Sequence, residues 1–268
     1  MKLQDKVVVV TGAGSGMGRE LALQLLKRGA NVAGIDVNPA ALQETAAKAS
    51  AGERFASFVV NVAERAAVEA LPAQVIERFG RVDGIINNAG IIQPFVRFKD
   101  LEWAAIERVM AVNFWGTLTM VRAFLPRLLD RPIAHIVNIS SMGGFLPVPG
   151  QSLYGASKAA VKLLTEALHS ELVDTPVRVT VVFPGAIATN IAANSGVTMS
   201  MSADDAKKSS IKMTPADRAV EIILDGVEAD AYRVLVGSDA KLMDALCRLD
   251  PRRAAGFIQR QMRELLAR

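Results

Sequence analysis

Tyr154 and Lys158 are two residues whose types and spacing could carry out chemistry together. Residues four apart on a helix are neighbours on its surface, so both side chains would share one face. The ammonium charge would favour the phenolate and lower the tyrosine pKa from its usual value of about 10. Such a tyrosine could exchange a proton with an alcohol or carbonyl oxygen near neutral pH. The pair alone is weak evidence, because the same spacing occurs by chance on many exposed helices.

A glycine-rich turn near the N-terminus follows an apolar stretch of β-branched residues, Lys6 to Val10, which predicts a buried parallel strand. After the turn, an amphipathic helix is expected over Met17 to Arg28. Strand, glycine turn and helix in this order place backbone amides where a pyrophosphate can bind. An ordinary glycine-rich turn is the alternative. The residues expected to contact a dinucleotide here are Gly12, Ser15, Gly16, Met17 and Gly18.

An acidic residue, Asp36, ends the next expected strand, Asn31 to Ile35. A carboxylate about 20 residues beyond the glycine turn can accept hydrogen bonds from the adenosine ribose. It would also repel the 2′-phosphate of NADP, and the next residue, Val37, supplies no base to offset that repulsion. We therefore expect NAD in preference to NADP. A turn residue at the strand end is the alternative for Asp36.

The segments that follow alternate between apolar strands and helices with short loops. This alternation predicts a Rossmann-type α/β fold, a doubly wound parallel sheet of about seven strands with helices on both faces. Ligands of such sheets bind beyond the carboxyl ends of the strands. Asn61, Val62 and the turn Asn88, Ala89 and Gly90 each follow an expected strand, so they would lie at that edge with Asp36. We expect one domain over residues 1–268.

Composition limits the function classes. The chain has 268 residues, of which 51% are hydrophobic, enough for one large α/β domain. The net charge of +4 comes from the arginines of the last 18 residues, so the body is about neutral, which argues against nucleic-acid binding. A single cysteine, Cys247, and isolated histidines give no metal-ligand set, so no metal is expected. No apolar segment approaches the ~20 residues of a membrane span, and we expect a cytoplasmic protein.

Taken together, these motifs resemble the short-chain dehydrogenase/reductase family of the single-domain type. The resemblance covers residues 5 to about 190 and rests on five motifs in the family's order. They are Thr11-Gly-x-x-x-Gly16-x-Gly18, Asn87-Asn-Ala-Gly90, Asn113, Ser141 and Tyr154-x-x-x-Lys158. The resemblance implies an NAD-linked oxidoreductase that interconverts an alcohol and a ketone or aldehyde without a metal.

The same resemblance assigns roles to particular residues. It implies that Tyr154 is the general acid–base and that Lys158 lowers the tyrosine pKa and binds the nicotinamide ribose. Ser141, rather than Ser140, would hold the substrate oxygen. Asn113 would bend its helix and anchor a water that passes protons to the lysine. Cofactor contacts are also implied after a later strand, with Thr189 at the nicotinamide carboxamide: Pro184, Gly185, Ile187 and Thr189.

The last third is less regular. The irregular pattern of residues 190–213 predicts either a loop that forms a lid over the substrate or a disordered segment. A mostly apolar substrate is expected if nearby apolar residues form its wall, and the alternative is that they are core: Phe95, Phe145, Leu146, Val148, Met199, Met201 and Met213. Thr214 and Pro215 suggest an N-cap and first residue of a helix. Many members of the family end in a short segment that is used in tetramer packing, whereas this chain continues in a helical extension expected over 238–268. We expect a homodimer or homotetramer.

Two rival functions remain open beside the oxidoreductase. One is an NAD(H)-sensing binding protein on the same fold, although such a protein has no need of Asn113, Ser141, Tyr154 and Lys158 together. The other is a peripheral membrane protein anchored by an apolar stripe among the C-terminal arginines: Phe257, Ile258, Met262, Leu265 and Leu266. We favour a tail that covers the substrate mouth or a partner subunit.

Overall fold

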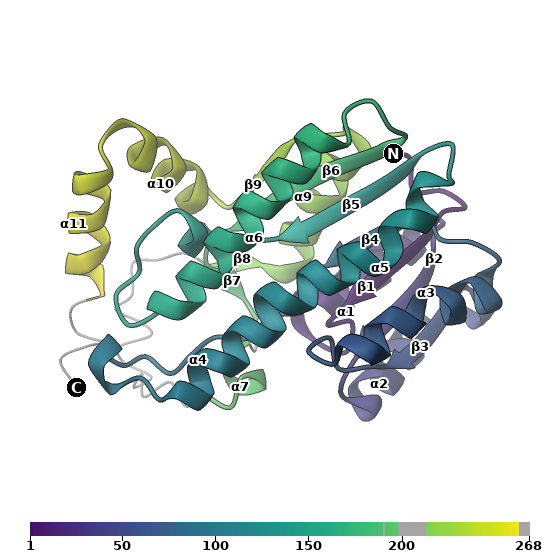
Figure 1. Ribbon diagram of the computed structural model, residues 1–268, viewed down its shortest axis with the longest axis horizontal. Coiled ribbons are helices and arrows are strands. Elements are labelled where there is room, and N and C mark those ends of the chain that lie inside the picture. The colour runs from purple at the N-terminus through teal and green to yellow at the C-terminus, as the bar shows by residue number, and fades with distance from the viewer. Residues whose placement is uncertain (190, 198–212, 263–268) are drawn as a thin grey trace.

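A parallel sheet of seven strands forms the middle layer of the protein, as predicted. The computed structural model describes residues 1–189, 191–197 and 213–262 (Figure 1). The strands lie in the order β3-β2-β1-β4-β5-β6-β9. Their bounds are β1 Val7–Thr11, β2 Asn31–Asp36, β3 Phe55–Val59, β4 Gly84–Asn87, β5 Ala134–Ile139, β6 Val177–Pro184 and β9 Arg233–Val236.

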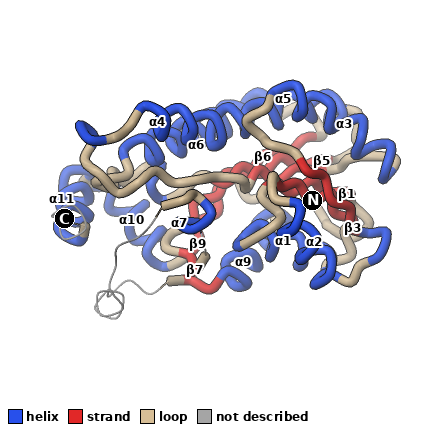
Figure 2. Tube along the Cα trace, turned by 90° about the horizontal axis from the view of Figure 1, so that it is seen from below, coloured by secondary structure: helices blue, strands red, loops and turns tan. Residues whose placement is uncertain are grey.

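Helices cover both faces of this sheet (Figure 2). On one face lie α1 Gly16–Lys27, α2 Pro39–Ala49 and α9 Ala216–Glu228. On the other lie α3 Arg65–Phe79, α5 Thr117–Leu129 and α6 Ser152–Glu171, and α4 Trp103–Met110 packs against α6. Short 3₁₀ turns occupy Gly52–Arg54, Phe98–Asp100 and Met142–Gly144.

The apolar residues of β1 show why the sheet lies in the middle layer. Side chains alternate between the two faces of a strand. Val8 and Val10 pack on the side of α1 and α9, whereas Val7 and Val9 pack on the side of α3 and α5. A strand with apolar residues at every position is stable only where both faces are covered. The run of valines therefore predicts the layering as well as the strand.

The order of the strands creates a crevice beside β1. The strand pairs with β2 on one side and with β4 on the other, so the chain crosses over at this point. Ligands of doubly wound sheets bind outside the carboxyl ends of the strands at such a switch point. The glycine turn after β1, Asp36 at the end of β2 and Asn88 after β4 all meet there.

The C-terminal residues form two further helices, α10 Ser238–Leu249 and α11 Pro251–Gln261. They lie at the end of the molecule far from the N-terminus (Figure 1). Leu146, from the segment after β5, is buried in one cluster with Met243, Ala254 and Ile258 of these helices. Other residues of the segment pack against this cluster, namely Met142, Phe145 and Val148. The interpretation as core therefore fits Phe145, Leu146 and Val148.

Two predictions for the last third need comment. The expectation that Thr214 caps a helix starting at Pro215 is wrong, because α9 begins at Ala216. Thr214–Pro215 is instead a short strand, β8, paired with β7, Ile187–Ala188, and the Thr214 amide donates to the carbonyl of Ala186 at 2.8 Å. Of the predicted lid, residues 190 and 198–212 lie outside the described residues, as do Leu265 and Leu266 of the apolar stripe. Within the described chain, no helix combines the length and hydropathy that a membrane crossing requires.

Candidate active site

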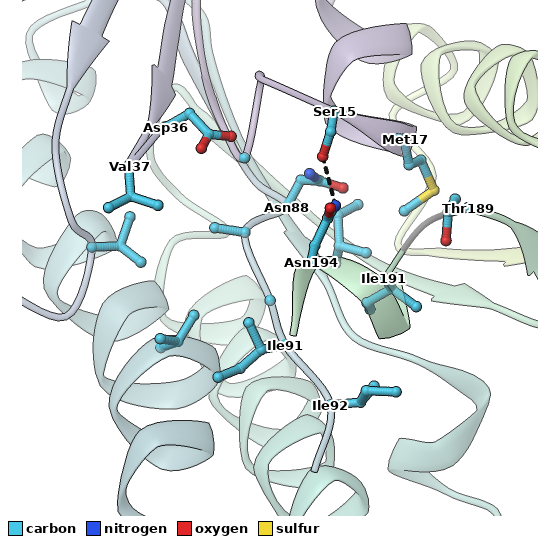
Figure 3. Close-up of a pocket in the computed structure, with 18 of the residues that line it drawn as sticks. Ser15, Met17, Asp36, Val37, Asn88, Ile91, Ile92, Thr189, Ile191 and Asn194 are labelled. Atoms are coloured by element: carbon cyan, nitrogen blue, oxygen red, sulfur yellow. Dashed lines mark hydrogen bonds between the residues drawn. The ribbon is translucent and has the colours of Figure 1, made fainter. Parts of the chain in front are cut away.

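A cavity of about 480 Å³ opens at the carboxyl edge of the sheet (Figure 3). Three of the four predicted catalytic residues line it, Ser141, Tyr154 and Lys158; Asn113 lies behind its wall. The remaining predicted cofactor residues all line it too: Gly12, Ser15, Gly16, Met17, Gly18, Asp36, Asn61, Val62, Asn88, Ala89, Gly90, Pro184, Gly185, Ile187 and Thr189. The structure therefore brings segments from six loops to one cavity.

The glycine turn has a shape that other residues could not adopt. Gly16 has φ of +50°, in the left-handed region where a side chain is strained. A Cβ on Gly18 would overlap the carbonyl oxygen of Gly12, so α1 can approach the turn only without a side chain at this position. Thr11 joins this turn to the neighbouring loop, because its hydroxyl accepts from the amides of Asn88 and Ala89, each at 3.0 Å.

Asp36, at the end of β2, is held in the crevice by backbone amides. Its Oδ2 accepts from the amide of Gly14 at 2.9 Å, and its Oδ1 accepts from the amide of Asn38 at 3.0 Å. Val37 stands beside it in the cavity wall with 66% of its surface exposed (Figure 3). Among the described lining residues, Asp36 and Lys158 are the only charged ones. Asp36 is therefore the one acidic group among these lining residues.

Lys158 also lines the cavity, and its amine is buried. Only 4% of the residue is exposed, and Nζ donates to the carbonyl of Ile139 at 2.9 Å. A Cβ on Gly90 would lie 3.2 Å from this Nζ and 3.4 Å from Oδ1 of Asn113, so the glycine leaves room for both groups. Ser141 Oγ accepts from the amide of Gly143 at 3.1 Å and also hydrogen-bonds the Tyr154 side chain.

The pKa values of this pair differ from the sequence-based expectation. Burial raises the pKa of Tyr154, and the hydrogen bond with Ser141 offsets this only in part. Burial also lowers the pKa of Lys158 to about 8. The expectation of a lowered tyrosine pKa is therefore wrong. The physical reason is desolvation, because burial destabilises the phenolate by more than the hydrogen bond with Ser141 stabilises it.

Asn113 occupies a π-helical turn, Ala111–Gly116, between α4 and α5. The residue is fully buried. Its Oδ1 accepts from the amide of Ile91 and its Nδ2 donates to the carbonyl of Ile91, both at 2.9 Å. Nδ2 also donates to Ser157 Oγ at 3.0 Å, next to Lys158 in the chain. The side chain therefore ties the loop after β4 to α6, and single π turns are often found at functional sites.

The structure adds lining residues that the sequence interpretation missed. Asn194, in the short helix α7 Ile191–Asn194, reaches across the cavity and donates from Nδ2 to Ser15 Oγ at 2.8 Å (Figure 3). Apolar side chains also line the wall, among them Ile91, Ile92, Val112 and Ile191. The weak periodicity after residue 190 gave no signal for Asn194, since its contact depends on where α7 lies in space.

Comparison with known proteins places the chain among oxidoreductases. The family model "short chain dehydrogenase" matches residues 6–199. The Mycobacterium tuberculosis protein named "Putative oxidoreductase SadH" is 40% identical over 257 residues, covering 92% of this chain and 91% of that protein.

Solved structures give the same picture. A short chain dehydrogenase/reductase from Burkholderia phymatum in complex with NAD has 29% identity and a TM-score of 0.82, covering 93% of this chain and 96% of that one. A short chain dehydrogenase from Burkholderia cenocepacia in complex with NADP has 26% identity and a TM-score of 0.81, covering 96% and 99%.

Proposed function

The chain belongs to the short-chain dehydrogenase/reductase family, and we propose that it is an NAD-preferring enzyme interconverting an alcohol, above all a secondary one, and the corresponding ketone or aldehyde. The observation that carries the proposal is the convergence of Ser141, Tyr154 and Lys158 on the cavity that also contains the glycine turn and Asp36.

The residues at the cavity fit a dinucleotide. Gly16 and Gly18 leave the backbone of the turn open to a pyrophosphate, and α1 directs its N-terminus there. Asp36 would accept hydrogen bonds from the adenosine ribose, and Lys158 would bind the nicotinamide ribose. The nicotinamide, when bound, supplies the hydride, so the protein contributes position and a proton. Thr189 would hold the carboxamide.

Proton transfer is assigned to Tyr154. Its raised pKa keeps the phenol protonated at neutral pH, which suits donation to a carbonyl oxygen during reduction. Oxidation would require the phenolate, and the charge of Lys158 stabilises that form only while the lysine is protonated, below about pH 8. Ser141 would hold the substrate oxygen beside the phenol. Asn113, fixed to Ile91 and Ser157, would keep α6 and its two catalytic side chains in place.

Preference for NAD over NADP is proposed from the charges at Asp36. A 2′-phosphate would meet this carboxylate and the apolar Val37, and among the described lining residues the only base is Lys158. Calorimetric titration with NADH and NADPH tests this assignment. We expect tighter binding of NADH, weakened at least tenfold in Asp36→Ala because the ribose hydroxyls lose a charged acceptor. Tighter binding of NADPH would refute the assignment while leaving the catalytic residues in place.

A mostly apolar substrate is the further part of the proposal. Ile91, Ile92 and Ile191 add apolar surface to the cavity, which favours a substrate without charge. The oligomeric state and the cytoplasmic location stay predictions. Membrane anchoring is not proposed, because Ile258 of the apolar stripe is buried within the protein's own C-terminal cluster.

The rival function, an NAD(H) sensor without turnover, makes a different prediction. A sensor binds NADH and converts no alcohol or ketone. A panel of secondary alcohols and ketones, followed by NADH absorbance, separates the two: turnover that is lost in Tyr154→Phe while NADH binding is retained supports the enzyme. Binding without turnover across the panel supports the sensor.

A further inference from the structure

The helix that carries Tyr154 is capped by a side chain from a distant loop. The first amides of a helix have no partner within it. The residue before α6, Gln151, makes no side-chain capping bond. Gln93, from the loop after β4, supplies the missing acceptor: its Oε1 accepts from the amide of Leu153 at 2.8 Å and from that of Tyr154 itself at 3.1 Å.

Gln93 is held in one orientation by further bonds. Its Nε2 donates to the carbonyl of Gly150 at 3.1 Å, and its own carbonyl accepts from Nε2 of Gln151 at 2.9 Å. The residue is fully buried. Both ends of the amide are therefore used, and a polar group buried at this depth would be costly if it were not. The side chain cannot move without breaking bonds to the start of α6.

The same loop forms the wall of the cofactor cavity. Gly90 and Ile92 line it, and the residue between them, Ile91, is bonded at both backbone groups by Asn113. The amide of Ile92 donates to Ser195 Oγ at 3.0 Å. Three successive residues, 91 to 93, are thus fixed by hydrogen bonds. Of these three residues, Gln93 is the one whose side chain bonds the backbone amide of Tyr154.

We propose that Gln93 is a positioning residue that sets where the Tyr154 hydroxyl lies relative to Ser141 and Lys158. This inference rests on the proposed oxidoreductase function. A cap that bonds the catalytic tyrosine's own amide fixes the height of its Cα along α6. Because small displacements of a reacting group lower rates strongly, this role predicts a loss of kcat with little change in cofactor binding.

Gln93→Met tests the proposal, since it keeps the length of the side chain and removes both polar ends. We expect kcat to fall about 10- to 100-fold, with KM for NAD changed by less than about twofold. Gln93→Glu keeps the acceptor at the helix N-terminus but loses the donor to the Gly150 carbonyl, so its kcat should lie above that of Gln93→Met and below that of wild type. Thr165→Val is the matched control, because Thr165 is buried on the same helix and also accepts a side-chain hydrogen bond, from Asn138.

A second readout does not depend on turnover. The chain has two tyrosines, so protein labelled with ¹³Cζ-tyrosine gives two signals, and Tyr154→Phe identifies one of them. In Gln93→Met the Tyr154 signal should shift, and the tyrosine pKa should fall towards its ordinary value as water reaches the loosened ring. Thr165→Val should leave this signal unchanged even if it lowers the melting temperature.

The outcomes separate the inference from the function on which it rests. If wild type turns over no substrate, the proposed function fails, and the tyrosine signal still decides the role of Gln93. If wild type is active and Gln93→Met keeps both its kcat and its Tyr154 signal, Gln93 only stabilises the fold and the proposal is overturned. Equal losses in Gln93→Met and Thr165→Val would overturn it too.

Discussion

The buried charge of Lys158 is expected to lower the free energy of unfolding of the protein. The lysine is 4% exposed, so solvent screens its charge little, and burial lowers its pKa from 10.5 to about 8. A difference of one pKa unit corresponds to about 1.4 kcal/mol. Keeping Lys158 charged in the folded state therefore costs about 3 kcal/mol of unfolding free energy below pH 8.

The direction of the pH dependence follows from the two states. Between about pH 8 and 10.5 the unfolded chain keeps the proton of this lysine and the folded protein releases it, so stability rises with pH in this window. For the pKa values given, about 2 kcal/mol of the gain falls between pH 7 and 9.5. Lys158→Met, which keeps the apolar stem and removes the charge, should lack this gain.

Urea unfolding of wild type and Lys158→Met at pH 7 and 9.5, followed by circular dichroism without cofactor, measures the effect. The variant also loses the hydrogen bond to Ile139, and this loss lowers its unfolding free energy equally at both pH values. Subtracting the unfolding free energy at pH 7 from that at pH 9.5 within each protein therefore removes this contribution. Wild type should gain about 2 kcal/mol more than the variant. An equal change in the two proteins would refute the reasoning, since it would mean that Lys158 is solvated in the folded state.

Three further predictions follow from the site and the sheet. Gly18→Ala should lower NADH affinity at least tenfold, because its Cβ would overlap the carbonyl of Gly12 and displace the turn; calorimetry measures it. Asn194→Ala should weaken NADH binding about three- to tenfold, mainly through faster dissociation, because it loses the bond to Ser15 across the cavity; stopped-flow fluorescence measures the rate. Burial lowers the pKa of His135 to about 3, so between pH 6.5 and 3 the unfolded chain binds a proton at this residue and the folded protein does not. The free energy of unfolding of wild type should therefore fall by about 2 kcal/mol between pH 7 and 5, and His135→Gln should not show this loss.

Each of the three has a clear contrary result. Unchanged NADH affinity in the folded glycine variant would mean that the turn does not contact the cofactor. An unchanged dissociation rate in the asparagine variant would mean that the bond across the cavity is absent once NADH binds. If urea unfolding at pH 7 and pH 5 showed the same loss of unfolding free energy in the histidine variant and in wild type, a group other than His135 would cause that loss.

Local patterns were sufficient to predict the sheet and its functional edge. In a parallel sheet, strand ends that are far apart in sequence meet at one edge, so each motif after a strand could be placed without knowing side-chain contacts. Asp36 at the end of β2 and Ser141 after β5 illustrate this. The glycine turn was equally predictable, because Gly16 and Gly18 leave few alternatives for the backbone.

What the sequence could not give depends on contacts between distant segments. The raised pKa of Tyr154 comes from desolvation by its surroundings. The spacing between Tyr154 and Lys158 in the sequence could predict only a nearby positive charge. Gln93 caps α6 from 60 residues away. Thr214 and Pro215 carry the local signature of a helix start, but pairing with Ile187–Ala188 holds them extended, so tertiary structure overrides the local preference.

The measurement that tests the central claim most directly is the rate of NADH oxidation with a panel of apolar ketones in wild type, Tyr154→Phe and Tyr232→Phe. Tyr232, the other tyrosine of the chain, is 41% exposed, packs with its ring tilted against that of His169 and does not line the cavity, so it is the matched control. We predict that Tyr154→Phe loses at least 100-fold in kcat and still binds NADH, whereas Tyr232→Phe keeps wild-type activity. Wild-type turnover that survives in Tyr154→Phe would contradict the account.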